Sequence, residues 1–98
     1  MTRLVLSPKA VDDIERLSEF LLASEPSTAS KTGGILVSGL QILKDHPLIG
    51  RQVERGFREL LISRGRTGYV ALYKFDVVKD VAIVLAIRHQ RESSFNPR

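Results

Sequence analysis

The chain has 98 residues, of which 43% are hydrophobic and 27% charged, and its formal net charge is +4 at pH 7. This length predicts one domain that buries about two-thirds of its unfolded surface, with residues 93–98 as a loose tail. Because cysteine is absent, disulfides, a thiolate zinc site and a thiol nucleophile are excluded. No apolar run approaches the roughly twenty residues that span a bilayer, and no cleavable signal is recognisable. We therefore expect a cytoplasmic protein with an anionic partner, no membrane association and no cofactor.

The first two predicted elements are a strand and an amphipathic helix. Residues Arg3 to Leu6 have the composition of a short strand, and the Ser7-Pro8 pair that follows is typical of a helix start. Serine caps free amide donors there, and proline fits the first helical position, where an N–H would be unpaired anyway. From Pro8 to about Ala23, apolar residues recur with helical period, which predicts one buried face. That face carries Ala10, Ile14, Leu17 and Leu21.

A second helix is predicted from a cap at Ser27 or Thr28 to the stop at Asp45-His46-Pro47. Its glycines leave two alternatives, because each costs roughly 1 kcal/mol relative to alanine inside a helix. Either they let two antiparallel helices approach closely, or Gly33-Gly34 breaks the helix. We prefer the hairpin of two helices.

Three strands are predicted in the second half of the chain. They are Phe57 to Ile62, the aromatic-rich segment Tyr69 to Phe75, and the continuous apolar run Val81 to Ile87, with a turn over 64–68. The last run is typical of a central strand covered on both faces, so we expect Leu85 to be buried. The order strand, helix, helix, three strands predicts an α+β domain, with a helical hairpin packed on one face of a small antiparallel sheet.

Enzyme motifs are mostly absent, and the chain has two histidines. His46 ends a helix, where contact with the last carbonyls is the better explanation. His89 follows the last apolar strand beside Arg88 and Arg91, where a histidine could exchange protons while arginines stabilise a phosphate. A merely solvated strand end is the better explanation of this cluster from sequence alone.

Arginine outnumbers lysine ten to five, and five arginines lie within residues 51–66. The planar guanidinium suits carboxylates and phosphates better than an ammonium does. Some of these arginines can instead form surface ion pairs with Glu54 and Glu59, which are worth about 0–1 kcal/mol. Tyr69 and Tyr73 share one strand face, where packing explains them better than base stacking.

Several of these motifs together resemble the RelE/ParE toxin superfamily of type II toxin–antitoxin modules. The resemblance covers nearly the whole chain, in order and at the right spacing. It rests on Ser7-Pro8-x-Ala10 with Asp13-Ile14, Pro47-x-x-Gly50-Arg51, Gly56-Phe57-Arg58-Glu59-Leu60, Tyr69-x-x-x-Tyr73 and Ile87-Arg88-His89-x-Arg91-Glu92. It implies a plasmid-stabilisation-like toxin neutralised by a ParD-like antitoxin, whose tail wraps it in a hetero-oligomer.

The superfamily has two branches, and the resemblance to each implies a different target. RelE-like members are ribosome-dependent endoribonucleases that cut messenger RNA, and they tend to carry an arginine where this chain has Val70. ParE-like members poison DNA gyrase without cutting RNA. Since valine can neither hold a phosphate nor move a proton, we expect a ParE-like gyrase poison, which is not an enzyme. The alternatives are a RelE-type nuclease and a degenerate toxin that only binds its antitoxin.

The candidate site residues follow from these interpretations. If the chain is a nuclease, the catalytic residues are His89, Arg88 and Arg91. The residues expected to bind the target are Arg58, Arg66, Arg88, His89 and Arg91. The residues expected to bind the antitoxin are Val5, Leu6, Arg51, Arg55 and Arg58.

Overall fold

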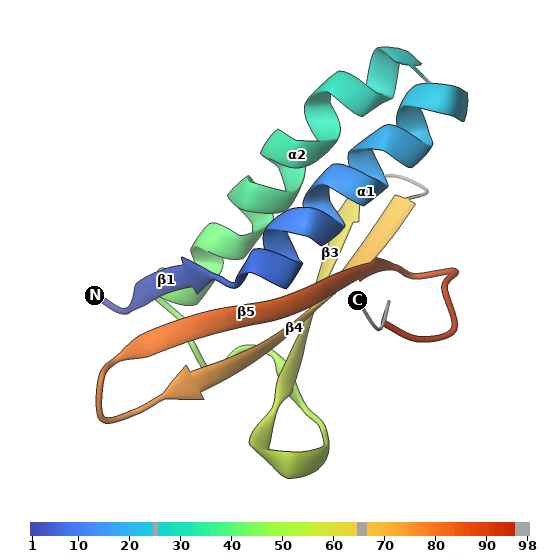
Figure 1. Ribbon diagram of the computed structural model, residues 1–98. Helices are drawn as coiled ribbons and strands as arrows, with labels where there is room; N and C mark the ends of the chain where they lie inside the picture. Colours follow the sequence, from blue (N-terminus) through green and yellow to red (C-terminus); the bar gives the residue numbers. More distant parts are fainter. Residues whose placement is uncertain (25, 65–66, 96–98) are drawn as a thin grey trace.

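In the computed structural model, two helices lie across one face of a five-stranded sheet (Figure 1). The structure describes residues 1–24, 26–64 and 67–95, with side chains except those of residues 20–32 and 63–67. The elements in chain order are β1 (Arg3–Leu6), α1 (Pro8–Ser24), α2 (Pro26–Leu40), a 3-10 turn η1 (Gln41–Lys44), β2 (Arg51–Gln52), a 3-10 turn η2 (Glu54–Gly56), β3 (Arg58–Arg64), β4 (Thr67–Asp76) and β5 (Val81–His89).

The sheet has the strand order β1-β5-β4-β3-β2. Antiparallel pairs join β2 to β3, β3 to β4 and β4 to β5, whereas β1 runs parallel to β5. The predicted α+β class and the helical hairpin on one face are confirmed, but the sheet is mixed rather than purely antiparallel. A short hairpin turn can join only antiparallel strands. The connection from β1 to β5 is long, so these two strands can run parallel. The two-residue strand β2 was not predicted, because it is too short to show a period.

The first helix begins as the sequence predicts. The hydroxyl of Ser7 accepts a hydrogen bond from the amide of Ala10 (3.1 Å), which satisfies one free donor of the first turn. In the part of the chain that the structure describes, no helix is long and apolar enough to cross a membrane.

The second helix passes through Gly33 and Gly34 without a break, so that alternative is wrong. A Cβ on Gly33 would meet Ile14 of α1 at 3.7 Å, which is ordinary contact. A Cβ on Gly39 would instead lie 2.7 Å from the Ile62 side chain. The close approach that a glycine allows is therefore between α2 and β3, and not between the helices.

The core lies between the helical hairpin and the sheet. Its largest fully buried side chains are Tyr73, Leu36, Leu40, Leu43, Ile87 and Val84. The prediction that Leu85 is buried is wrong, because that side chain is only half-buried. Successive partners across β4 and β5 are Leu72 with Ala86 and Tyr73 with Val84, so Leu85 is the extra residue of a bulge. Strand β5 is nonetheless internal, since it pairs on both sides.

Candidate functional site

The two residues at the end of β5 lie on opposite faces of the sheet. Consecutive side chains of a strand alternate between faces, and Arg88 pairs with Val70 while His89 pairs with Tyr69. Tyr69 belongs to the core beneath the helices. Arg88 therefore lies on the face that carries no helix, which we call the open face.

The guanidinium of Arg88 holds the chain that follows β5. Its Nη1 donates to the carbonyl of Glu92 (2.8 Å), with longer contacts to the carbonyls of His89 (3.3 Å) and Gln90 (3.4 Å). Its Cζ lies 5.2 Å from the centre of the Phe95 ring, a distance at which a cation and a ring attract. We call residues 89–95 the carboxyl-terminal turn.

The ring of His89 is also fixed by local contacts. Its Nδ1 accepts a hydrogen bond from the amide of Arg91 (3.0 Å), so a neutral ring carries its proton on Nε2. The ring packs edge-on against Tyr69, with centroids 5.4 Å apart. Arg91 itself is exposed.

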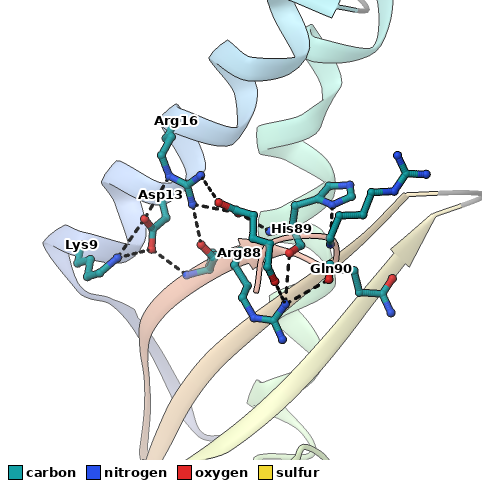
Figure 2. A network of polar contacts seen from close by, with 9 residues as sticks. Lys9, Asp13, Arg16, Arg88, His89 and Gln90 are labelled. Atoms are coloured by element: carbon teal, nitrogen blue, oxygen red, sulfur yellow. Dashed lines mark hydrogen bonds and ion pairs between the residues drawn. The ribbon is translucent and has the colours of Figure 1, made fainter. Parts of the chain in front are cut away.

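A network of charged side chains joins α1 to this turn (Figure 2). The buried carboxylate of Asp13 accepts the amide of Ile87 (2.9 Å) and forms an ion pair with Lys9 (2.9 Å). Arg16, one helical turn further on, donates from Nη1 to Glu92 (3.0 Å) and from Nη2 to the Ile87 carbonyl (3.3 Å). Buried polar groups without partners are costly, and this network pairs a carboxylate that is only 2% exposed.

These helix side chains take the place of a strand partner for the far end of β5. Strand β1 ends at Leu6, and beyond it the Ser7 hydroxyl donates to the Leu85 carbonyl (3.1 Å). Asp13 and Arg16 then satisfy the amide and carbonyl of Ile87. A free strand edge invites pairing with other chains, and here α1 covers it.

The carboxylate of Glu92 is the link between network and turn. It accepts the amide of His89 (2.8 Å) as well as the guanidinium of Arg16. Partial burial alone would raise its pKa. The two donors outweigh that effect, so the pKa of Glu92 is lowered from its ordinary value of 4.5.

The arginines before β3 differ in their contacts. We call residues 47–58 the basic loop. Arg51 is exposed and pairs with Glu59 (2.7 Å). Arg55 is exposed and adopts a left-handed backbone with φ of 63°. Arg58 instead donates from Nη1 to the carbonyls of Leu48 (3.0 Å) and Gly50 (2.8 Å), so its guanidinium supports the loop.

The hydroxyl of Tyr73 fixes the start of the same loop. It accepts the amide of Gly50 (2.9 Å) and donates to the carbonyl of Pro47 (2.7 Å). A Cβ at Gly50 would lie 2.6 Å from the tyrosine ring, so only glycine fits without displacement. Burial raises the pKa of Tyr73 above 10.0, and the Gly50 amide and Arg58 oppose that shift less strongly.

The basic loop and Phe95 border an open depression of about 600 Å³. Arg51 and Arg55 line it together with the apolar side chains Phe57 and Leu72. The depression therefore combines apolar side chains with cationic ones and with the carboxylates of Glu54 and Glu59.

The two predicted residues of β1 lie on different faces. Val5 is 37% exposed, whereas Leu6 packs against the core. Arg66 lies outside the described residues.

Comparisons with known proteins agree with this architecture. The sequence matches the family described as the ParE toxin of the type II toxin–antitoxin system parDE over residues 4–94. The chain belongs to the ParE toxin family. It is 34% identical to Toxin RelE3 of Caulobacter vibrioides, over 94% of this chain and 98% of that protein. It is 33% identical to Toxin RelE1 of the same organism, over 71% and 75%.

Two solved structures share the ParE-family fold seen here. One is the chromosomal ParDE toxin–antitoxin system from P. aeruginosa, with a TM-score of 0.75 and 22% identity, covering 91% of this chain and 96% of that one. The other is the toxin–antitoxin complex RelBE2 from Mycobacterium tuberculosis, with a TM-score of 0.57 and 22% identity, covering 91% and 98%.

Within this ParE-family chain, the structure brings together only part of the predicted site. Arg88, His89 and Arg91 share one turn, whereas Arg51 and Arg55 lie at the depression and Arg58 is engaged in its loop. The sequence did not reveal the network of Asp13, Arg16 and Glu92. One signal was present: Asp13 stands on the same helix arc as Ala10, Ile14 and Leu17, where a charged residue is out of place.

Proposed function

We propose that this chain is the toxin of a type II module that inhibits DNA gyrase and is neutralised by an antitoxin. The observation that carries the choice of target is the position of Arg88 and His89 on opposite faces of the sheet. A nuclease needs a proton-transfer group and a charge stabiliser within hydrogen-bond reach of one phosphate. This geometry favours binding over cleavage.

The partner of Arg88 across the sheet supports the same choice. Val70 stands directly opposite Arg88 and is 8% exposed. RelE-like nucleases tend to have an arginine at that position, which would lie beside Arg88 on the open face. Because residue 70 is a valine, this pair of positions on the open face carries one guanidinium, that of Arg88, whereas those enzymes would carry two.

The curated relatives carry the name RelE, so the nuclease is the alternative that the experiment must address. We expect purified toxin to accumulate cleaved DNA–gyrase complexes and to leave ribosome-bound messenger RNA intact. Arg88→Ala should lose most of the gyrase effect, and Asp76→Ala, at the far end of the sheet, serves as control. In a nuclease, His89→Ala would lower cleavage by about 10²–10⁴-fold, and such His89-dependent cleavage would refute the gyrase proposal. Antitoxin binding without either activity would identify a degenerate toxin.

For the antitoxin, the depression beside the basic loop is the surface that fits best. Its apolar side chains and the exposed Arg51 and Arg55 suit a segment that alternates apolar residues with carboxylates. Such a carboxylate would compete with Glu59 for Arg51. Val5 is exposed on β1, the edge strand at the opposite side of the same sheet, and is a separate apolar contact for the same partner. The two structural neighbours are a toxin–antitoxin system and a toxin–antitoxin complex, which supports a protein partner.

Charge reversal at the loop tests this docking surface. We expect Arg51→Glu with Arg55→Glu to slow antitoxin association by about tenfold at low salt, because steering depends on opposite charges. The difference from wild type should shrink as salt rises, since exposed charges are screened. Lys79→Glu, in the turn between β4 and β5, is the matched control. Equal association rates for the loop variant and wild type would exclude this surface.

A further inference from the structure

We infer that Glu92 and Arg16 are positioning residues, which hold the carboxyl-terminal turn so that Arg88 and Arg91 are presented to the target. This inference rests on the proposed function, because it concerns the same basic group. It assigns a role in target inhibition to Glu92 and Arg16, which are not among the residues expected to bind the target.

The first step is that the turn has few backbone bonds of its own. Strand β5 ends at His89, and the amide of Gln90 bonds to the Gly68 carbonyl (2.9 Å). After that, the amide of Glu92 bonds back to the His89 carbonyl (3.0 Å). Two backbone bonds restrain a turn weakly, so side chains must complete its conformation.

The second step is that the Glu92 carboxylate supplies those missing restraints. One oxygen, Oε1, accepts the amide of His89 (2.8 Å), and the other, Oε2, accepts Nη1 of Arg16 (3.0 Å). The backbone carbonyl of Glu92 accepts a hydrogen bond from Nη1 of Arg88 (2.8 Å). One residue thus fixes the start of the turn, its attachment to α1 and the direction of the Arg88 side chain.

The third step is that Arg16 is itself held in place from both sides. Its Nη2 donates to the Ile87 carbonyl (3.3 Å), and its Nε lies 3.7 Å from the buried Asp13. Asp13 also accepts a hydrogen bond from the Ile87 amide, so α1 and β5 are joined next to Arg16. The guanidinium therefore presents a fixed donor to Glu92, and hydrogen bonds between charged groups are directional and stronger than neutral ones.

Glu92→Ala and Arg16→Ala test the inference, with gyrase inhibition and antitoxin affinity measured on the same folded proteins. We expect the toxin concentration for half-maximal inhibition to rise about tenfold in either variant, as the loss of charged hydrogen bonds implies. Antitoxin affinity should fall less than inhibition does, because Phe95 is the one residue of the turn among those that line the depression. The double variant should lose less than the sum of the two single losses, because the two side chains share one contact.

Asp76→Ala is the matched control for the loss of a carboxylate that caps a turn. The carboxylate of Asp76 accepts a hydrogen bond from the amide of Lys79, three residues away (3.1 Å). The carboxylate of Glu92 accepts one from the amide of His89 in the same way. The two turns lie at opposite ends of β5. We expect the control to leave inhibition unchanged. Hydrogen exchange of the His89 amide should accelerate in Glu92→Ala and not in the control. Glu92→Gln keeps an acceptor oxygen and should restore part of the inhibition.

The outcomes separate this inference from the proposed function. If Arg88→Ala abolishes inhibition while Glu92→Ala and Arg16→Ala do not weaken it, the function stands and the positioning role is wrong. If Glu92→Ala loses inhibition and antitoxin affinity in parallel with its melting temperature, the residue is merely structural. If Arg88→Ala inhibits gyrase as well as wild type, the basic group is not the binding group, and both proposals fail.

Discussion

The basic loop and the carboxyl-terminal turn both carry arginines, but they are held in place by different chemistry. The loop is fixed by the buried hydroxyl of Tyr73, which bonds the backbone of Pro47 and Gly50. The turn is fixed by the Glu92 carboxylate, whose side chain is 34% exposed and which pairs with Arg16. One region is held by an uncharged group in the core together with bonds from Arg58 to loop carbonyls, and the other by an ion pair near solvent.

This difference determines what each region contributes to the folded state. A buried amide that loses its partner costs about 1–3 kcal/mol. An ion pair near the surface contributes about 0–1 kcal/mol, because water and salt screen it. The position of the loop is therefore coupled to global stability, whereas the turn can lose its order while the domain stays folded.

Tyr73→Phe should have the largest effect on stability. Phenylalanine keeps the ring in the core but leaves the Gly50 amide without its partner, so we expect a loss of about 1–3 kcal/mol in the free energy of unfolding. Urea denaturation measures this loss as a lower midpoint with an unchanged slope.

The control for that variant is Leu61→Ala, in the neighbouring strand β3, where the side chain is 56% exposed. Substitutions at exposed positions usually change stability by less than about 0.5 kcal/mol. If Tyr73→Phe unfolds at the same urea concentration as wild type, the hydroxyl does not hold the loop, and the contrast between the two regions disappears.

The elements of this fold could be predicted from sequence because each depends on a local pattern. The helix that begins at Pro8 has a capping serine and a 3.6-residue period, and the apolar run from Val81 has strand composition. The parallel pairing of β1 with β5 could not be predicted, since it joins residues 78 positions apart. The bulge at Leu85 is also non-local, because it depends on the register between two strands.

The candidate site was harder to predict, since residue type does not reveal a contact. Arg58 matched the pattern of binding arginines, yet its guanidinium donates to two carbonyls of its own loop. Arg16 reaches Glu92, 76 residues away, a contact that its position on α1 does not indicate. A count of arginines therefore indicated an anionic partner without indicating which guanidinium groups are available to it.

The smallest predicted effect is a difference in how the two regions respond to pH. The pKa of Glu92 is lowered in the folded state, so its contribution to stability is present above pH 4.5 and is lost as pH falls through the folded pKa. The pKa of Tyr73 is raised, so its contribution is present below pH 10.0 and is lost as pH rises through the folded pKa. We therefore expect the free energy of unfolding to change less steeply with pH in acid for Glu92→Gln. In alkali it should change less steeply for Tyr73→Phe.

The measurement is urea denaturation of wild type and both variants from acid to alkaline pH. For Glu92→Gln we expect a difference below about 1 kcal/mol, because the ion pair is partly exposed. Each variant serves as the control for the other, since each retains the ionisable group that the other lacks. If both variants flatten the same part of the profile, the groups are not independent. In that case the basic loop and the carboxyl-terminal turn would be coupled, and variants of the loop would also change how the turn presents Arg88 and Arg91.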